Sequence, residues 1–251
     1  MRNLLQPLQN WRYLQRLRQR LLQQVKLFIS FSKQVRQPNL RHYIRDMGIL
    51  MFKIQPYYYI DGWLEAPEAA ALYRFAHSLP KGSHVVEIGC WKGKSTYCLA
   101  RGLRPGSRVI TIDPFDASGE ADSTEIYQER KGATPLYDQF RQRMRELRVL
   151  HKIRPLPGVS AQFVGRIPRI DFLFVDGDHS VEGCRFDFTH YAPYIRRGGY
   201  LAFHDYNATL KDFGPTWVVE NEVLPSKEYQ FVGLFHTLWV GRKLSARSGP
   251  A

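Results

Sequence analysis

The chain has 251 residues, of which 44% are hydrophobic and 24% are charged, so it can form one domain with a sizeable core, whereas two full catalytic domains would be crowded. It contains no run of about eighteen uncharged apolar residues, and no apolar stretch leads to a small-residue cleavage site, which excludes a transmembrane helix and disfavours a secretory signal. The three cysteines, Cys90, Cys98 and Cys184, are widely spaced, which favours reduced thiols over disulfides or a zinc site and predicts a cytoplasmic protein.

The net charge of +13 is concentrated at the amino terminus. Residues 1–53 hold eleven Lys or Arg and one acid, a net charge of +10, whereas the rest of the chain is nearly balanced at +3. Within this arm apolar residues recur every three or four positions from Leu4 to Phe28, which predicts a basic amphipathic helix. Such a helix can pack on the body or on a second subunit, lie on an anionic membrane surface through residues 1–36, or contact RNA. The pattern alone does not decide among these partners.

Beyond the arm, helical and strand patterns alternate. A helical stretch at 40–53 leads to Tyr57–Tyr59, and another helix begins near Pro67, whose fixed φ suits a first turn. The remaining pattern predicts strands at 84–89, 108–113, about 151–155, 170–176 and 198–205, helices at 94–102, about 136–147 and 181–195, and a hairpin around 229–243. This order predicts an α/β fold, a Rossmann-like, doubly wound, mostly parallel sheet of about seven strands with an antiparallel C-terminal strand and an N-terminal helical extension. The predicted division is an arm at 1–60, a body at 61–244 and a disordered tail at 245–251.

The segment EIGCWKGKST at 87–96 lies where a strand turns into a helix, the place where α/β sheets bind nucleotide-like ligands. Gly89 and Gly93 allow a sharp turn and close approach of the backbone, and Glu87 can orient that turn or meet a cofactor amine. Asp113 ends the next strand, about 20 residues on, where a carboxylate can bind ribose hydroxyls. A phosphate-binding loop is disfavoured because three residues rather than four separate the glycines, and NAD binding is disfavoured because Trp91 stands in place of a middle glycine. A tight loop with a purely structural role stays open.

Polar residues follow two buried strands that should be neighbours in the sheet: Asp176, Asp178, His179, His204 and Asp205. Their position should gather carboxylates and imidazoles beside the bound cofactor. Carboxylate oxygens suit a divalent cation such as Mg²⁺, and His179 is a candidate base because imidazole titrates near neutrality in water. Alternatively, Asp178 caps the following helix and His204 is a satisfied, half-buried histidine.

Residues 83–243 resemble the class I S-adenosylmethionine-dependent methyltransferases, particularly the group of macrocin O-methyltransferase-like and cephalosporin-hydroxylase-like proteins. The resemblance rests on EIGCWKGKST, Asp113, LPGVSAQF at 156–163, IDFLFVDGDHSVEG at 170–183 and RRGGYLAFHDY at 196–206. It implies that Glu87, Gly89 and Gly93 hold the methionine end of the cofactor, that Asp113 holds the ribose, and that Ser160 lies near the adenine. Trp91 replaces a glycine that many of these enzymes have.

Metal-dependent relatives within this resemblance place a metal-binding aspartate three residues before a catalytic base, and Asp176 and His179 match that spacing. Asp176 would also border the cofactor, and Asp205 matches a second metal ligand. His204 stands where a relative commonly has an acid.

The resemblance thus implies methyl transfer from S-adenosylmethionine to a hydroxyl of a small molecule, such as a sugar or a secondary metabolite, with Mg²⁺ assistance. The long connection at 114–133 and Tyr57–Tyr59 are predicted to shape the acceptor pocket. A silent Rossmann-like binding module tethered by its arm and an RNA methyltransferase are the alternatives. Because the body is nearly charge-balanced, nucleic acid is the disfavoured partner. A homo-oligomer and a membrane-peripheral location stay open.

Overall fold

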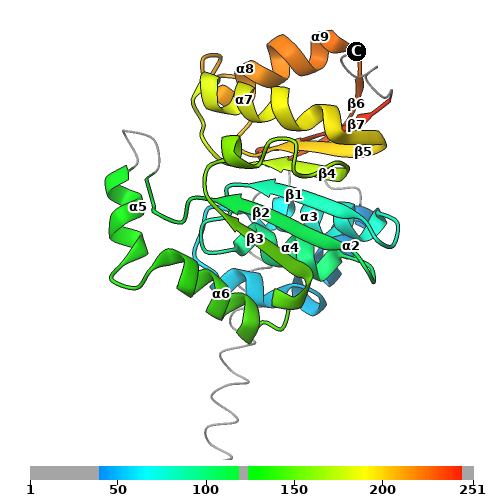
Figure 1. Cartoon of the computed structure of the whole chain (residues 1–251). Coiled ribbons are helices and arrows are strands. Elements are labelled where there is room, and N and C mark those ends of the chain that lie inside the picture. The colour runs from blue at the N-terminus through cyan, green and yellow to red at the C-terminus, as the bar shows by residue number, and fades with distance from the viewer. Residues whose placement is uncertain (1–39, 119–123, 245–251) are drawn as a thin grey trace, which may run out of the picture.

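The computed structural model describes residues 40–118 and 124–244 (Figure 1). The predicted amphipathic helix of the arm and the predicted tail at 245–251 lie outside these residues. Within the described part of the chain, no helix is both long and apolar enough to cross a bilayer.

A seven-stranded sheet forms the centre of the molecule, with strand order β3-β2-β1-β4-β5-β7-β6. The strands are β1 His84–Ile88, β2 Arg108–Asp113, β3 Ile153–Pro157, β4 Ile170–Val175, β5 Ile195–Phe203, β6 Tyr229–Phe235 and β7 Leu238–Lys243. Strands β1 to β5 are parallel, while β7 pairs antiparallel with both β5 and β6. The Rossmann-like sheet with an antiparallel C-terminal strand is therefore confirmed.

Helices cover both faces of the sheet (Figure 1). On one face lie α2 Leu40–Phe52, α3 Ala66–Ser78, α4 Lys94–Gly102 and α6 Leu136–Glu146, together with the 3₁₀ helix Gln55–Tyr59. On the other face lie α7 Val181–Tyr191 and a continuous helical stretch that comprises α8 Gly214–Val218, a π turn at Val219–Val223 and α9 Leu224–Ser226.

Neighbouring residues of one strand serve the two opposite cores. Val85 of β1 packs in the core shared with α3 and α4, whereas Val86 packs in the core shared with α7. The same alternation along β4 separates Phe172 from Leu173. Because successive side chains of a strand point to opposite faces, both sets of positions must be mostly apolar here. The buried exceptions, Glu87 of β1 and Asp171 of β4, accept hydrogen bonds.

Strand β3 lies two residues later than the strand predicted near 151–155, and β5 begins three residues earlier than the strand predicted at 198–205. Two further predicted elements differ more. The helix predicted for 181–195 ends at Tyr191, a 3₁₀ turn at Ala192–Tyr194 follows, and Ile195 already begins β5. Pro193 has no N–H to donate to the helix, which explains the early end. The connection at 114–133 was expected to be a loop, yet Thr124–Lys131 form helix α5. Its sequence TEIYQERK is rich in good helix formers, and Glu125 lies in its first turn.

Candidate active site

The loop after β1 is shaped by two glycines with left-handed backbone angles. Gly89 has φ +82° and Gly93 has φ +87°. A Cβ on Gly89 would lie 1.9 Å from the carbonyl oxygen of Asp176, so only glycine lets this loop contact the loop after β4. Trp91, between them, also has a positive φ of 49°, which costs a bulky residue energy unless its surroundings hold it there.

Asp113, at the end of β2, supplies that support. Its Oδ2 accepts hydrogen bonds from the backbone N–H groups of Cys90 and Trp91 at 2.8 and 2.9 Å, and its Oδ1 accepts one from Phe115 at 2.7 Å. Burial nevertheless raises the pKa of this carboxyl above its ordinary value. Asp113 therefore braces the glycine loop, and ribose binding by this residue stays a prediction.

Glu87 lies beneath the same loop and is fully buried. Its two carboxyl oxygens accept hydrogen bonds from Ser95 Oγ and Thr96 Oγ1, both at 2.5 Å. These hydroxyls lie in the first turn of α4, so Glu87 joins β1 to that helix and orients the turn between them. Contact between Glu87 and a cofactor stays a prediction.

The pKa of Glu87 makes stability depend on pH. Burial raises this pKa from 4.5 to about 7, so between these values the folded protein keeps a proton that the unfolded chain has released. The contribution of Glu87 to the free energy of unfolding is therefore full below pH 4.5 and falls by on the order of 3 kcal/mol as pH rises through 7.

Glu87→Gln should flatten that part of the pH dependence, because glutamine stays neutral. Urea unfolding at a series of pH values would measure the difference. Asp187 has a similarly raised pKa of about 7, so its own contribution to the pH dependence of stability remains in the variant. Parallel stability curves for Glu87→Gln and the wild type would contradict the prediction.

Ser160 begins a 3₁₀ turn after β3, and its carbonyl oxygen accepts a hydrogen bond of 2.6 Å from the Tyr191 hydroxyl. The buried Asp187 on α7 adjoins it, and burial raises the pKa of Asp187 although the Ser160 side chain opposes the shift. Asp187 was not predicted as a site residue; its only signal in the sequence is an acid on the inward helical face that carries Cys184 and Phe188. Whether Ser160 lies near an adenine stays a prediction.

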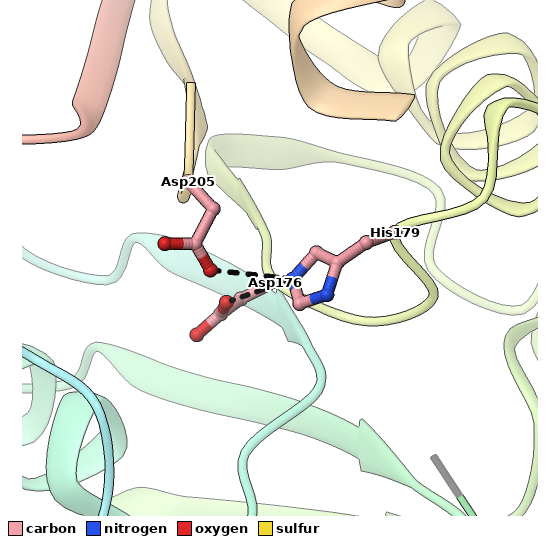
Figure 2. A group of neighbouring side chains, drawn as sticks. All are labelled: Asp176, His179 and Asp205. Carbon is pink, nitrogen blue, oxygen red and sulfur yellow. Dashed lines mark ion pairs between the residues drawn. The ribbon is translucent and has the colours of Figure 1, made fainter. Parts of the chain in front are cut away.

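Asp176, His179 and Asp205 come together at the carboxyl ends of β4 and β5 (Figure 2). His179 Nε2 lies 3.9 Å from Asp176 Oδ1 and 3.5 Å from Asp205 Oδ2. One potential ligand atom of each residue lies within 4.8 Å of the other two. The predicted gathering of carboxylates and imidazole is therefore present, while the catalytic and metal-binding roles stay predictions.

Asp178 does not join this group. Its Oδ1 accepts a hydrogen bond from the Ser180 N–H, and Ser180 is the residue that caps α7 by accepting from Gly183 N–H. The expected helix cap is thus Ser180 rather than Asp178.

His204 lies behind the cluster and is buried rather than half-buried. Its Nδ1 is 2.9 Å from Asp205 Oδ2 and 3.2 Å from Asp176 Oδ1, and its Nε2 is 3.1 Å from Glu68 Oε2. Burial alone would lower the pKa of His204, but these three carboxylates outweigh it and raise the pKa well above 6.5. For the acid Asp176 burial acts in the opposite direction and would raise the pKa, yet His204 and His179 hold this pKa below its ordinary value.

Glu68 on α3 anchors His204 from the opposite side. It is fully buried, and besides His204 it accepts hydrogen bonds from the Glu65 N–H, the Thr237 N–H, the Thr237 hydroxyl and His236 Nδ1 at 2.7 to 3.3 Å. These donors outweigh burial and hold the pKa of Glu68 far below its ordinary value. Glu68 was not predicted as a site residue, because an acid in the first turn of a helix predicts only a bond such as the one it accepts from the Glu65 N–H.

Aromatic side chains connect α5 to the glycine loop. The rings of Trp63, Trp91 and Tyr127 lie 5.0 to 6.0 Å apart, and the Arg130 guanidinium lies 4.0 Å above Trp63. Arg130 and Lys92 both pair with Asp61. The described part of the 114–133 connection therefore adjoins the loop after β1, and its predicted role at the acceptor pocket stays a prediction.

Comparisons with known proteins agree with this architecture. Residues 86–206 match the model of a family described as a methyltransferase domain. The uncharacterized protein R132 of Acanthamoeba polyphaga mimivirus is 27% identical over 122 residues, which is 48% of this chain and 50% of that protein. The chain thus spans about half the length of this curated relative.

Solved structures of O-methyltransferases share the fold. The O-methyltransferase NovP is 18% identical with a TM-score of 0.57, over 72% of this chain and 81% of that one. An O-methyltransferase from Bacillus cereus in complex with SAH is 13% identical with a TM-score of 0.56, over 81% and 97%. The O-methyltransferase TomG from Streptomyces achromogenes, involved in tomaymycin synthesis and solved with SAM, is 15% identical with a TM-score of 0.55, over 84% and 92%. Residues 86–206 thus match a methyltransferase domain, and the chain has the Rossmann-like fold of these O-methyltransferase structures.

Proposed function

We propose that the protein transfers a methyl group from S-adenosylmethionine to a hydroxyl of a small molecule, such as a sugar or a secondary metabolite. The observation that carries this proposal is the convergence of Asp176, His179 and Asp205 at the edge of the sheet where the glycine loop also lies. Oxygen as the acceptor atom is supported by the structural neighbours NovP and TomG, which are described as O-methyltransferases.

The loops after β1 and β4 fit S-adenosylmethionine as the methyl donor. Gly89 and Gly93 keep Cβ atoms out of the loop after β1, and Asp176 begins the loop that Gly89 contacts. Together with Glu87, Asp113 and Ser160, these residues would hold the cofactor, Glu87 and Asp113 partly by fixing the course of the glycine loop. When bound, S-adenosylmethionine would supply a methyl carbon on a positively charged sulfur, so that an acceptor oxygen could form the new C–O bond in line as the C–S bond breaks and S-adenosylhomocysteine leaves.

His179 is the proposed base for the acceptor hydroxyl. Its Nε2 faces both carboxylates of the cluster, which stabilise the imidazolium that forms when the ring takes the acceptor proton. Asp176 and Asp205 are themselves held by His204 from behind. The acceptor oxygen would thus lose its proton to a ring that neighbouring side chains keep in place.

The two carboxylates of this cluster fit a divalent cation such as Mg²⁺. They offer convergent oxygen donors, whereas His179 is kept for the base, and His204 occupies the place of the further acid that the resemblance leads one to expect. We propose Asp176 and Asp205 as ligands. A bound cation would lower the pKa of a coordinated hydroxyl.

Calorimetric titration of S-adenosylmethionine into the full chain, with and without magnesium, tests the proposal. Saturable one-to-one binding is expected, followed by release of S-adenosylhomocysteine in a screen of hydroxylated acceptors. If a chelator leaves that turnover unchanged, the cation is not needed. Absence of binding at millimolar cofactor would overturn the proposed function.

A further inference from the structure

The outward face of α2 exposes two large apolar side chains. Ile44 and Phe52 are 61% and 75% exposed, and because Phe52 follows Ile44 by eight positions, a little over two turns, they lie on the same side of the helix. Gly48 lies between them, and a Cβ there would meet nothing within 4 Å. The inward face of the same helix packs on α3 through Met47 and Leu50, which are buried. Ile44 and Phe52 are therefore not needed for the core.

Cationic side chains border this apolar strip. Arg41, Arg45, Lys53 and Arg101 are all exposed. The only acid of α2, Asp46, is buried and pairs with Arg45 and Arg74. Beside Phe52 the surface forms a hollow of about 360 Å³ whose lining includes Lys53, Tyr97 and Arg101. The strip thus combines exposed apolar atoms with an excess of positive charge.

We propose that this face of α2, the strip of Ile44, Gly48 and Phe52 with its four cations, is a contact surface for an anionic lipid bilayer. Apolar side chains that enter the acyl boundary and cations that meet anionic headgroups are the two features by which interfacial helices bind membranes. Juxtamembrane Lys and Arg strengthen this attraction. Both features are found on this one face.

Charge argues against the other occupants. Residues 1–39 immediately precede α2 and contain eight Lys or Arg and no acid, so this arm would be repelled by the cations of the strip. A second copy that offered the same face would be repelled for the same reason. Nucleic acid would accept the positive charge, and a base could stack on Phe52, but the aliphatic Ile44 would have no such partner. An anionic bilayer satisfies both the charge and the apolar side chains, and the basic arm would add to the attraction.

The test is co-sedimentation of the full chain with vesicles of equal parts phosphatidylcholine and phosphatidylglycerol, and with phosphatidylcholine vesicles alone. We expect binding to the mixed vesicles only, weakened by added salt. The double variant Ile44→Ser/Phe52→Ser should lower the affinity about tenfold, because it removes most of the apolar area that would leave water. Thermal unfolding should be unchanged, since both side chains are exposed.

Phe231→Ser provides the matched control. Phe231 is 54% exposed on β6, so its replacement removes a similar apolar side chain away from α2 and should leave vesicle binding unchanged. Absence of wild-type binding to anionic vesicles would overturn the proposal. So would equal binding by the double variant and the wild type, which would assign the contact to another part of the chain. Loss of self-association or of RNA binding in the double variant, without vesicle binding by the wild type, would also overturn it in favour of those partners.

Discussion

His179→Gln should slow methyl transfer by about 10² to 10⁴, the usual contribution of a positioned acid or base. Glutamine keeps a polar group at this position, but it cannot take the proton that the acceptor hydroxyl must lose. The affinity for S-adenosylmethionine should change little, because His179 is not among the proposed cofactor residues and Asp176 keeps its second partner, His204, in the variant. Single-turnover transfer rates at saturating cofactor and acceptor, together with calorimetric cofactor binding, separate the two effects.

His190→Gln is the control for that experiment. His190 lies on α7, where its ring stacks on Phe186 and its Nδ1 contacts the Phe186 carbonyl oxygen, outside the carboxylate cluster. Its replacement should leave the rate unchanged. A wild-type rate in His179→Gln would remove His179 as the base, and equal losses of cofactor affinity and rate would point to a disturbed cofactor site instead.

The sequence predicts those elements that depend on local patterns. Helix α4 and strand β2 have the predicted bounds. Their signals, a short β-branched run and turns that contain glycine, lie within a few residues of each element. The meeting of Asp176 and Asp205 was also predictable, since both follow buried strands that pair in parallel. Helix α5 was missed because its polar sequence buries no side chain and therefore shows no apolar stripe.

Contacts between side chains that are far apart in the sequence could not be predicted. Glu68 contacts His204, which lies 136 residues later in the chain. In the sequence pattern Glu68 cannot be distinguished from an exposed acid in the first turn of a helix, such as Glu182. The direction of the Asp113 carboxylate is a similar case. A strand-end aspartate can face a ligand or a backbone N–H group, and here the left-handed Trp91 places N–H groups within its reach.

Glu68→Gln should lower the free energy of unfolding by about 3 to 5 kcal/mol, the usual cost of removing one partner of a buried ion pair. The variant leaves His204 without its buried countercharge on the side of α3 and turns an amide N–H₂ group toward donors that need an acceptor. Glu182→Gln, an exposed acid in the first turn of α7, should cost about 0.5 kcal/mol or less. Urea unfolding of both variants and the wild type measures the difference.

The pH dependence of the Glu68→Gln deficit tests the cause. Glu68 has a lowered pKa, so its stabilisation is present above the ordinary carboxyl value of 4.5 and is lost as pH falls. His204 has a raised pKa, so its stabilisation is full below 6.5 and is lost as pH rises through the folded value. The deficit should therefore be largest between pH 4.5 and 6.5. A deficit that does not vary with pH would mean that Glu68 acts through packing and neutral hydrogen bonds, whereas one that is largest in this window and declines on both sides of it would identify the ion pair that holds His204 against Asp176 and Asp205.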